Sequence, residues 1–168
     1  IIDLDTLSDA KQVGLRKLLP GKPRIGVGMG TCGIGNGAQN VFQRFEEALA
    51  QKKLDAVLVP VGCLGYCAAE PLVSVHLPNQ PMIVFSGVQV EDVDAIVAEL
   101  AVGRMPTAKA LCRIEEWDHH TAHTAFGRGL AEIPLWNEVP FFRGQKKIVL
   151  RNCGLINPED IEEYIAVG

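Results

Sequence analysis

Hydrophobic residues in the first third of the chain follow two periods, one helical and one extended. Leucine and valine recur at helical spacing over residues 4–19, and a Pro-Gly-Lys-Pro segment ends this predicted helix. Residues 24–28 then predict a short strand, and residues 54–61, apolar nearly throughout, predict a strand buried on both faces. Between the strands a helix is predicted from Asn36 or Gly37 to Lys52, with Asn36 as its N-cap. Its apolar positions are Val41, Phe45, Ala48 and Leu49.

The next segment predicts a hairpin followed by a helix. Residues 72–77 alternate between apolar and polar, a Pro-Asn-Gln-Pro turn follows, and residues 82–85 complete the hairpin. Residues 90–100 place Val90, Val93, Ile96, Val97 and Leu100 on one helical face. The resulting order is β-α-β-β-β-α. This predicts an α/β fold with the thioredoxin-like arrangement of four strands and flanking helices.

Periodicity is lost in the second half of the chain. Residues 104–139 contain several prolines and glycines and predict a long connector. Residues 147–150 predict a short strand, and Asn157 followed by Pro158 predicts the start of a helix that runs to the end of the chain. We therefore divide the chain into an N-terminal helix (1–22), a thioredoxin-like domain (23–103), a connector (104–139) and the first elements of another domain (140–168).

Composition and charge narrow the classes of function. Of 168 residues, 48% are hydrophobic and 21% charged, as in a globular protein. The net charge of -4 argues against a nucleic-acid partner, and Lys146-Lys147 is too short for a phosphate-binding surface. No apolar stretch approaches the roughly 18 residues of a membrane span. The first residue, Ile1, is not methionine, so we expect the chain to begin inside a longer product.

Three of the five cysteines lie in two glycine-bearing turns. Cys32 belongs to the first turn, and Cys63 and Cys67 belong to the second. Each turn follows a predicted strand, and two adjacent parallel strands would bring both turns to one edge of the sheet. Thiolates gathered there suit a soft metal centre, above all an iron–sulfur cluster. Without a signal peptide, the cysteines favour a reducing, cytoplasmic location. The alternative is that Cys63 and Cys67 are buried structural thiols.

The first turn also matches a dinucleotide-binding pattern. Gly28, Gly30 and Gly33 have the spacing G-x-G-x-x-G after a predicted strand. That pattern requires an acidic residue at the end of the second strand, where this chain has Val61 and Gly62. The glycines serve equally well to bring backbone amides close to a cluster. A disulfide oxidoreductase would need Cys-x-x-Cys at this helix, and Cys32 is followed by Gly-Ile-Gly.

The remaining metal-ligating residues give weaker patterns. A helix at residues 119–123 would place His119 and His123 on one face as a possible zinc pair. The preferred interpretation of this histidine-rich segment is a solvated connector. Cys112 and Cys153 are isolated in the sequence, and we interpret both as small core residues.

With these residues in view, the chain resembles a known redox family. Residues 24–103 look like the thioredoxin-like [2Fe–2S] ferredoxins. Residues 138–168, beginning EVPFFRGQKKIVLRNCGLI, resemble the start of the flavin-containing, NADH-binding subunit of respiratory complex I. In this order the two parts are similar to the fused subunit of NADH-linked hydrogenases, formate dehydrogenases and electron-bifurcating complexes.

The resemblance implies a ligand set and a function. Cys32, Cys63 and Cys67 match the second, third and fourth cluster ligands, and Gly28 stands where the first thiolate is expected. The implied role is electron transfer between a [2Fe–2S] cluster and the flavin of a downstream domain, within a multisubunit redox complex. FMN, NAD and a further iron–sulfur cluster would bind beyond Gly168, so this chain alone should be inactive with NADH. The alternative is a cluster-free scaffold that docks partner subunits.

Overall fold

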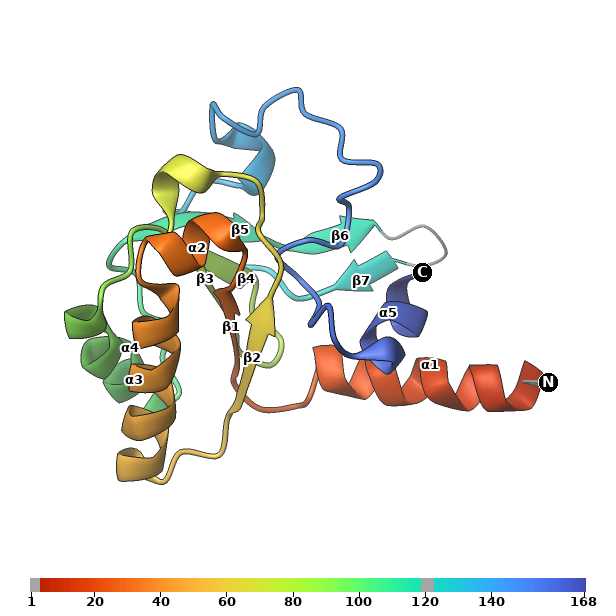
Figure 1. Ribbon diagram of the computed structural model, residues 1–168, viewed down its shortest axis with the longest axis horizontal. Coiled ribbons are helices and arrows are strands. Elements are labelled where there is room, and N and C mark those ends of the chain that lie inside the picture. The colour runs from red at the N-terminus through yellow and green to blue at the C-terminus, as the bar shows by residue number, and fades with distance from the viewer. Residues whose placement is uncertain (1–3, 119–122) are drawn as a thin grey trace.

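A five-stranded sheet forms the centre of the protein. The computed structural model describes residues 4–118 and 123–168 (Figure 1). The strands are β1 (Arg24–Gly28), β2 (Val57–Val61), β3 (Val73–His76), β4 (Met82–Phe85) and β5 (Ala110–Ile114), in the order β2-β1-β3-β4-β5. β1 and β2 are parallel, and the other neighbouring strands pair in antiparallel fashion. The first four strands have the thioredoxin-like arrangement, so the predicted fold class is confirmed.

Five α-helices and three 3-10 turns complete the described structure. The helices are α1 (Leu4–Leu18), α2 (Thr31–Gly35), α3 (Ala38–Lys52), α4 (Val93–Ala101) and α5 (Ile161–Val167). The 3-10 turns are η1 (Cys67–Ala69), η2 (Val90–Asp92) and η3 (Trp136–Glu138), and β6 (Glu116–Asp118) pairs with β7 (His123–Ala125) as a separate ribbon. No helix of the described ranges combines the length and apolar character needed to cross a membrane.

The sheet separates two hydrophobic cores. One face of β1, β3 and β4 packs under α3 and α4, which lie together on the left in Figure 1. The opposite face packs on residues that follow α4, including Trp117, Phe142 and Leu155. Because both faces are covered, all residues of β1, β3 and β4 are buried. The central strands are therefore apolar on both sides, as in other covered sheets.

Two elements near the cysteines differ from the prediction. β2 was expected to be buried on both faces, but it is the edge strand and most of it is only half-buried. Pro60 fits this edge position, because it has no amide hydrogen to donate to another strand. The short helix α2 was not predicted, and it delays the start of the next helix. Gly37, with φ of 93°, caps α3 in place of Asn36, whose side chain donates to the carbonyl of Cys32.

The second half contains more regular structure than expected. Residues 104–139 provide the fifth strand of the sheet, the β6–β7 ribbon and η3. The predicted strand at 147–150 is absent: these residues form turns, and their apolar side chains are exposed. The predicted helix start at Asn157 is also wrong. α5 begins at Ile161, and the carboxylate of Asp160 accepts hydrogen bonds from the amides of Glu162 and Glu163.

The C-terminal residues pack on the N-terminal helix. α1 and α5 lie side by side, and Gly14 is what permits their close approach (Figure 1). A Cβ atom added to Gly14 would lie 1.9 Å from the carbonyl oxygen of Glu162. Leu155, Ile156, Ala166 and Val167 are buried in this contact region. Residues 155–167 therefore pack against other parts of this chain.

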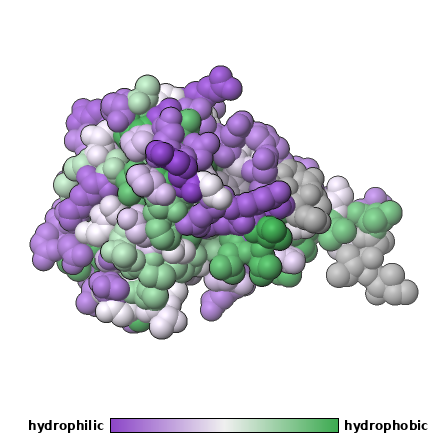
Figure 2. Space-filling model, turned by 90° about the horizontal axis from the view of Figure 1, so that it is seen from above, coloured by the Kyte–Doolittle hydropathy of each residue, from purple (hydrophilic) through white to green (hydrophobic). Residues whose placement is uncertain are grey.

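One loop of this region remains uncovered. Ile148, Val149 and Leu150 expose 68%, 93% and 58% of their surface, whereas apolar residues on either side are buried. Seen from above, the molecule shows a compact hydrophobic patch on an otherwise mixed surface (Figure 2). Three consecutive exposed aliphatic residues are unusual on a monomeric surface and are typical of contact surfaces.

Candidate metal centre

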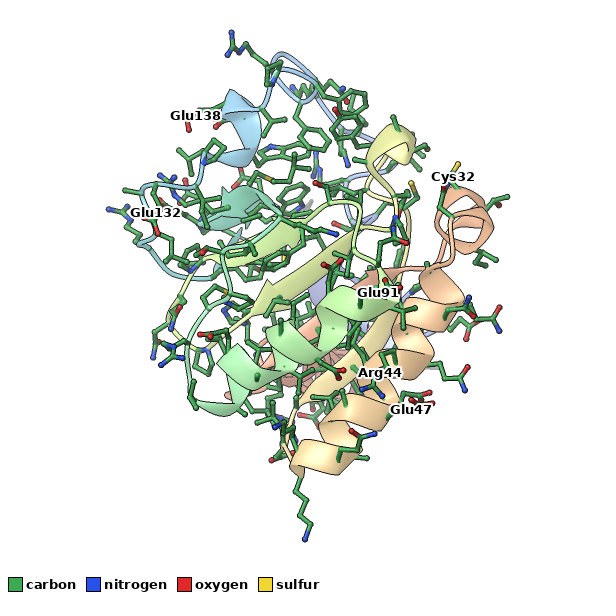
Figure 3. All side chains as sticks on the ribbon, turned by 90° about the vertical axis from the view of Figure 1, so that its left-hand side faces the viewer. Cys32, Arg44, Glu47, Glu91, Glu132 and Glu138 are labelled. Atoms are coloured by element: carbon green, nitrogen blue, oxygen red, sulfur yellow. The ribbon has the colours of Figure 1, made fainter. Side chains whose placement is uncertain are left out.

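The parallel pair β1–β2 sets the position of the first cysteine turn. Gly28 is opposite Val61, so both strands end at the same edge of the sheet. α2 follows β1 directly and carries Cys32 at the rim of the molecule (Figure 3). A Cβ atom on Gly30 would lie 2.8 Å from the Cβ atom of Cys63. The first turn can therefore approach the second this closely only because residue 30 is glycine.

The second turn brings two sulfur atoms together. The Sγ atoms of Cys63 and Cys67 are 3.9 Å apart. Gly65 takes a positive φ of 101° between them, and its amide donates to the Cys63 sulfur over 3.3 Å. Two thiolates on one tetrahedral ion, with bonds of about 2.3 Å, have sulfur atoms about 3.8 Å apart. The spacing of this pair therefore fits two ligands of one metal atom.

A buried carboxylate, which the sequence analysis missed, lies beside this pair. Glu70 is only 7% exposed, and its Oε2 accepts a hydrogen bond of 2.7 Å from the Leu72 amide. Its Oε1 lies 3.4 Å from the Cys63 sulfur, whose thiol donates to it. The sequence signal was an isolated acid in the apolar segment that leads into β3. Such an acid is buried only when it has partners.

The surroundings of the thiols favour their protonated form. Burial raises the pKa of Cys63 to about 12, with Glu70 and Cys67 contributing in the same direction and the Gly65 amide opposing them. The pKa of Cys32 is also raised, first by its hydrogen bond with Cys67 and then by nearby charge that includes Glu70. At neutral pH these thiols therefore keep their protons unless a metal ion displaces them.

The C-terminal region forms a wall of the site. Tyr66 stacks on Phe141 with 4.0 Å between ring centroids. Lys147 donates to the carbonyl of Leu64, and burial lowers the pKa of its amine although Cys153 and Cys63 act to raise it. Cys153 lies against the second turn, because a Cβ atom on Gly62 would be 3.6 Å from its sulfur. The sequence analysis assigned residues 140–168 and the cysteine turns to different parts of the chain. The structure brings Cys153 and Lys147 next to the second turn.

The residues present fit a two-metal cluster better than a single ion. In the described ranges, no three His, Cys, Asp or Glu side chains are placed to hold one metal ion. A [2Fe–2S] cluster requires something else, namely two ligands on each of two iron atoms. Cys63 and Cys67 supply one such pair, and Cys32 contacts Cys67 from the neighbouring turn. All three predicted cysteines are thus brought together, and Gly28 lies at the end of β1 beside them.

Other residues singled out from the sequence lie elsewhere. Cys112 is fully buried in the sheet, as expected of a small core residue. His119 lies outside the described residues, while His123 belongs to β7 and bonds to Asp118. A buried carboxylate at the glycine-rich turn disfavours a bound phosphate, which argues against the dinucleotide pattern that the sequence left open. A pocket of about 510 Å³ is lined by Trp117, Trp136 and Lys147 among others, and none of the described residues that line it is a cysteine.

A thiol-rich site at one edge of a thioredoxin-like sheet defines the class of this protein. Over 87 residues the chain is 31% identical to the NADP-reducing hydrogenase subunit HndB of Solidesulfovibrio fructosivorans, an alignment that covers 51% of this chain and 69% of that subunit. The chain therefore belongs to the family of this hydrogenase subunit. No family model matches it.

Solved structures give a weaker likeness. A thioredoxin-like [2Fe–2S] ferredoxin from Aquifex aeolicus is 24% identical, with a TM-score of 0.48, over 55% of this chain and 92% of that chain. A second structure of the Aquifex aeolicus ferredoxin, in wild-type form, is 26% identical, with a TM-score of 0.46, over 53% and 95%. Both scores are below 0.5, so the fold assignment depends on the strand order and directions given above.

Proposed function

We propose that this chain is an electron-transfer domain that holds a [2Fe–2S] cluster on Cys32, Cys63 and Cys67. The observation that carries the proposal is the pair of sulfur atoms 3.9 Å apart, next to a third thiol from the neighbouring turn. Family membership supports it, because the relative is named as a subunit of a hydrogenase, which is a redox enzyme.

The chain's own residues prepare the site for this group. When bound, a [2Fe–2S] cluster accepts and releases one electron at a potential set by charge, hydrogen bonds to sulfur and exposure. The Gly65 amide donates to the Cys63 sulfur, which stabilises negative charge there. Gly30 lets the two turns meet without a side chain between them. Lys147 brings a partly buried positive charge close to Cys63.

The wider assignment follows from the resemblance of residues 138–168. We propose that the domain works in a cytoplasmic multisubunit complex and exchanges electrons with the FMN of an NADH-oxidising flavoprotein region. The exposed residues Ile148, Val149 and Leu150 support a contact of this kind, since they lie in that segment and are uncovered. NAD, FMN and a further iron–sulfur cluster would all bind outside the 168 residues, so the chain alone should show no NADH oxidation.

A cluster-free scaffold is the second candidate. It is favoured by the count of only three cysteines at the site and by thiols that the protein keeps protonated. In this case the fold and the exposed loop would serve only to dock partner subunits.

Iron and sulfide analysis of the chain, purified without oxygen, separates the two candidates. We expect equal amounts of iron and acid-labile sulfide, with charge-transfer absorption in the visible range that dithionite bleaches. Cys112→Ala is the matched control, because Cys112 is buried away from the turns and should leave the absorption unchanged. A chain that stays free of iron after anaerobic reconstitution would establish the scaffold instead.

A further inference from the structure

The proposed site has three cysteines, one fewer than a four-cysteine cluster needs, and a carboxylate lies beside Gly28, where the resemblance places the missing thiolate. A Cβ atom built on Gly28 would lie 3.1 Å from Oε2 of Glu70 and 3.4 Å from Oε1. A cysteine side chain at position 28 would therefore extend into the volume that the Glu70 carboxylate fills. Gly33 opens the same volume from α2, since its Cβ atom would be 3.3 Å from Oε2.

The Glu70 carboxylate is held in this place by few bonds. Oε2 accepts from the Leu72 amide, and Oε1 accepts from the Cys63 thiol; within the described residues these are the hydrogen bonds of the carboxylate. The metal-binding form of cysteine is the thiolate, which has no proton to donate. Once Cys63 binds metal, the contact to Oε1 becomes one between two negative groups, in a site where Glu70 is 7% exposed. A carboxylate buried beside a thiolate is stabilised by a cation between them, and an iron atom at this place would be such a cation.

We propose that the Glu70 carboxylate is the fourth protein ligand of the cluster, in place of the thiolate that Gly28 cannot supply. This inference rests on the proposed function. Glu70 would complete the second iron together with Cys32, while Cys63 and Cys67 hold the first. A carboxylate carries the same single negative charge as a thiolate, so the net charge of the site stays that of four cysteines. On binding, a carboxylate oxygen lone pair is donated to iron and the cysteine protons pass to solvent.

Cys153 is the alternative fourth ligand. Its sulfur lies against Gly62, at the start of the second turn, whereas the resemblance places the missing thiolate at Gly28, at the end of β1. It is also supplied by a distant part of the chain. The two possibilities are separated by removing each group in turn.

The test uses isosteric variants of the full chain, purified anaerobically and reconstituted with iron and sulfide. Glu70→Gln keeps an oxygen that can accept from the Leu72 amide but removes the negative charge. Glu132→Gln is the matched control, because Glu132 is exposed and lies on the opposite side of the molecule from Cys32 (Figure 3). Cys153→Ser tests the alternative ligand. The double variant Gly28→Cys/Glu70→Gln supplies a thiol at the vacant position and removes the carboxylate.

We expect Glu70→Gln to lose iron to a chelator at least ten times faster than the wild type, while Glu132→Gln and Cys153→Ser lose it at the wild-type rate. The double variant should regain iron with stronger thiolate-to-iron absorption and shifted EPR g-values, because its fourth ligand is sulfur rather than oxygen. If Glu70 has only a structural role, the single variant Glu70→Gln should keep the g-values of the wild type.

The outcomes distinguish failure of this inference from failure of the proposed function. If the wild type binds iron and sulfide, and Glu70→Gln has the same spectrum and iron retention, Glu70 is not a ligand while the cluster stands. If Cys153→Ser alone loses iron, the fourth ligand is Cys153. If the wild type never binds iron, the proposed function and the inference fall together.

Discussion

Arg24 and Glu163 form a buried ion pair that joins the first strand of the sheet to the last helix. Arg24 Nη2 donates to both carboxylate oxygens of Glu163 over 3.1 and 2.9 Å, and the two residues are 4% and 2% exposed. The second guanidinium nitrogen donates to the carbonyl of Leu155, and the Asn157 amide donates to Glu163. The pair therefore fixes the C-terminal segment, which also forms a wall of the cysteine site, against β1.

Removal of one partner should destabilise the protein strongly. We expect Glu163→Ala to lower the free energy of unfolding by about 3–5 kcal/mol, because it leaves the Arg24 charge buried without a counterion. The measurement is denaturant unfolding followed by circular dichroism. Glu132→Gln, on the exposed surface, should change the free energy of unfolding by less than about 0.5 kcal/mol. An unchanged unfolding midpoint for Glu163→Ala would mean that the C-terminal segment is not docked as described.

Gly14 should also be intolerant of substitution, for steric reasons. In Gly14→Ala the added carbon would lie 1.9 Å from the Glu162 carbonyl, so α1 and α5 must separate. Overpacking of this kind costs about 1–3 kcal/mol, despite the higher helix propensity of alanine. The control is Gly35→Ala, where nothing lies within 4 Å of the added carbon. Equal stability of the two variants would contradict the close packing of α1 on α5.

The sequence predicted the local elements whose periodicity is strong. The alternating β3–β4 hairpin, the amphipathic α3 and α4, and the strand–turn order that places Cys32 near Cys63 follow from spacing alone. The elements that the sequence analysis missed depend on pairing between residues far apart in the chain. β5 pairs with β4 although a helix lies between the two strands in the sequence. No pattern in residues 104–114 indicates this pairing. The exposed apolar run 148–150 has strand composition but no neighbouring strand, so it forms a bend and a turn.

In the candidate site, too, residues in a local sequence pattern were predicted and residues brought in by long-range packing were missed. Cysteine spacing identified the three thiols, since each follows a strand of a parallel pair. Glu70 escaped notice because a single acid has no periodicity, and only the fold reveals that it points at Gly28. Lys147 and Cys153 reach the site through packing of residues more than 80 positions away. Local patterns cannot encode such contacts.

Stability should depend on pH through His76. Burial lowers the pKa of this histidine, the nearby Arg24 acts in the same direction, and the carbonyl of Phe126 opposes them. The unfolded chain therefore takes up a proton at a higher pH than the folded chain does. Stability is full above the unfolded pKa of about 6.5 and declines as pH falls from there toward the folded pKa.

The comparison of wild type with His76→Leu isolates this contribution. The other three histidines are present in both proteins, including His123, whose pKa is raised by Asp118 and which acts in the opposite sense. We expect the difference in free energy of unfolding between the two proteins to shrink or reverse between pH 7 and pH 5. A difference that stays constant across this range would show that His76 titrates normally in the fold.

The last prediction concerns the cysteine pair itself. Cys63→Ala and Cys67→Ala should each abolish the visible absorption of the reconstituted chain, because each removes one of two sulfur atoms placed 3.9 Å apart for one metal atom. The effect should come from ligation and not from unfolding, since Cys67 is exposed and its removal leaves the core intact. Circular dichroism of the Cys67→Ala variant should therefore match the wild type while its iron content falls to background. Cys153→Ser should keep both iron and spectrum, as expected of a wall residue. Full absorbance in Cys67→Ala would show that the two turns do not form a metal centre.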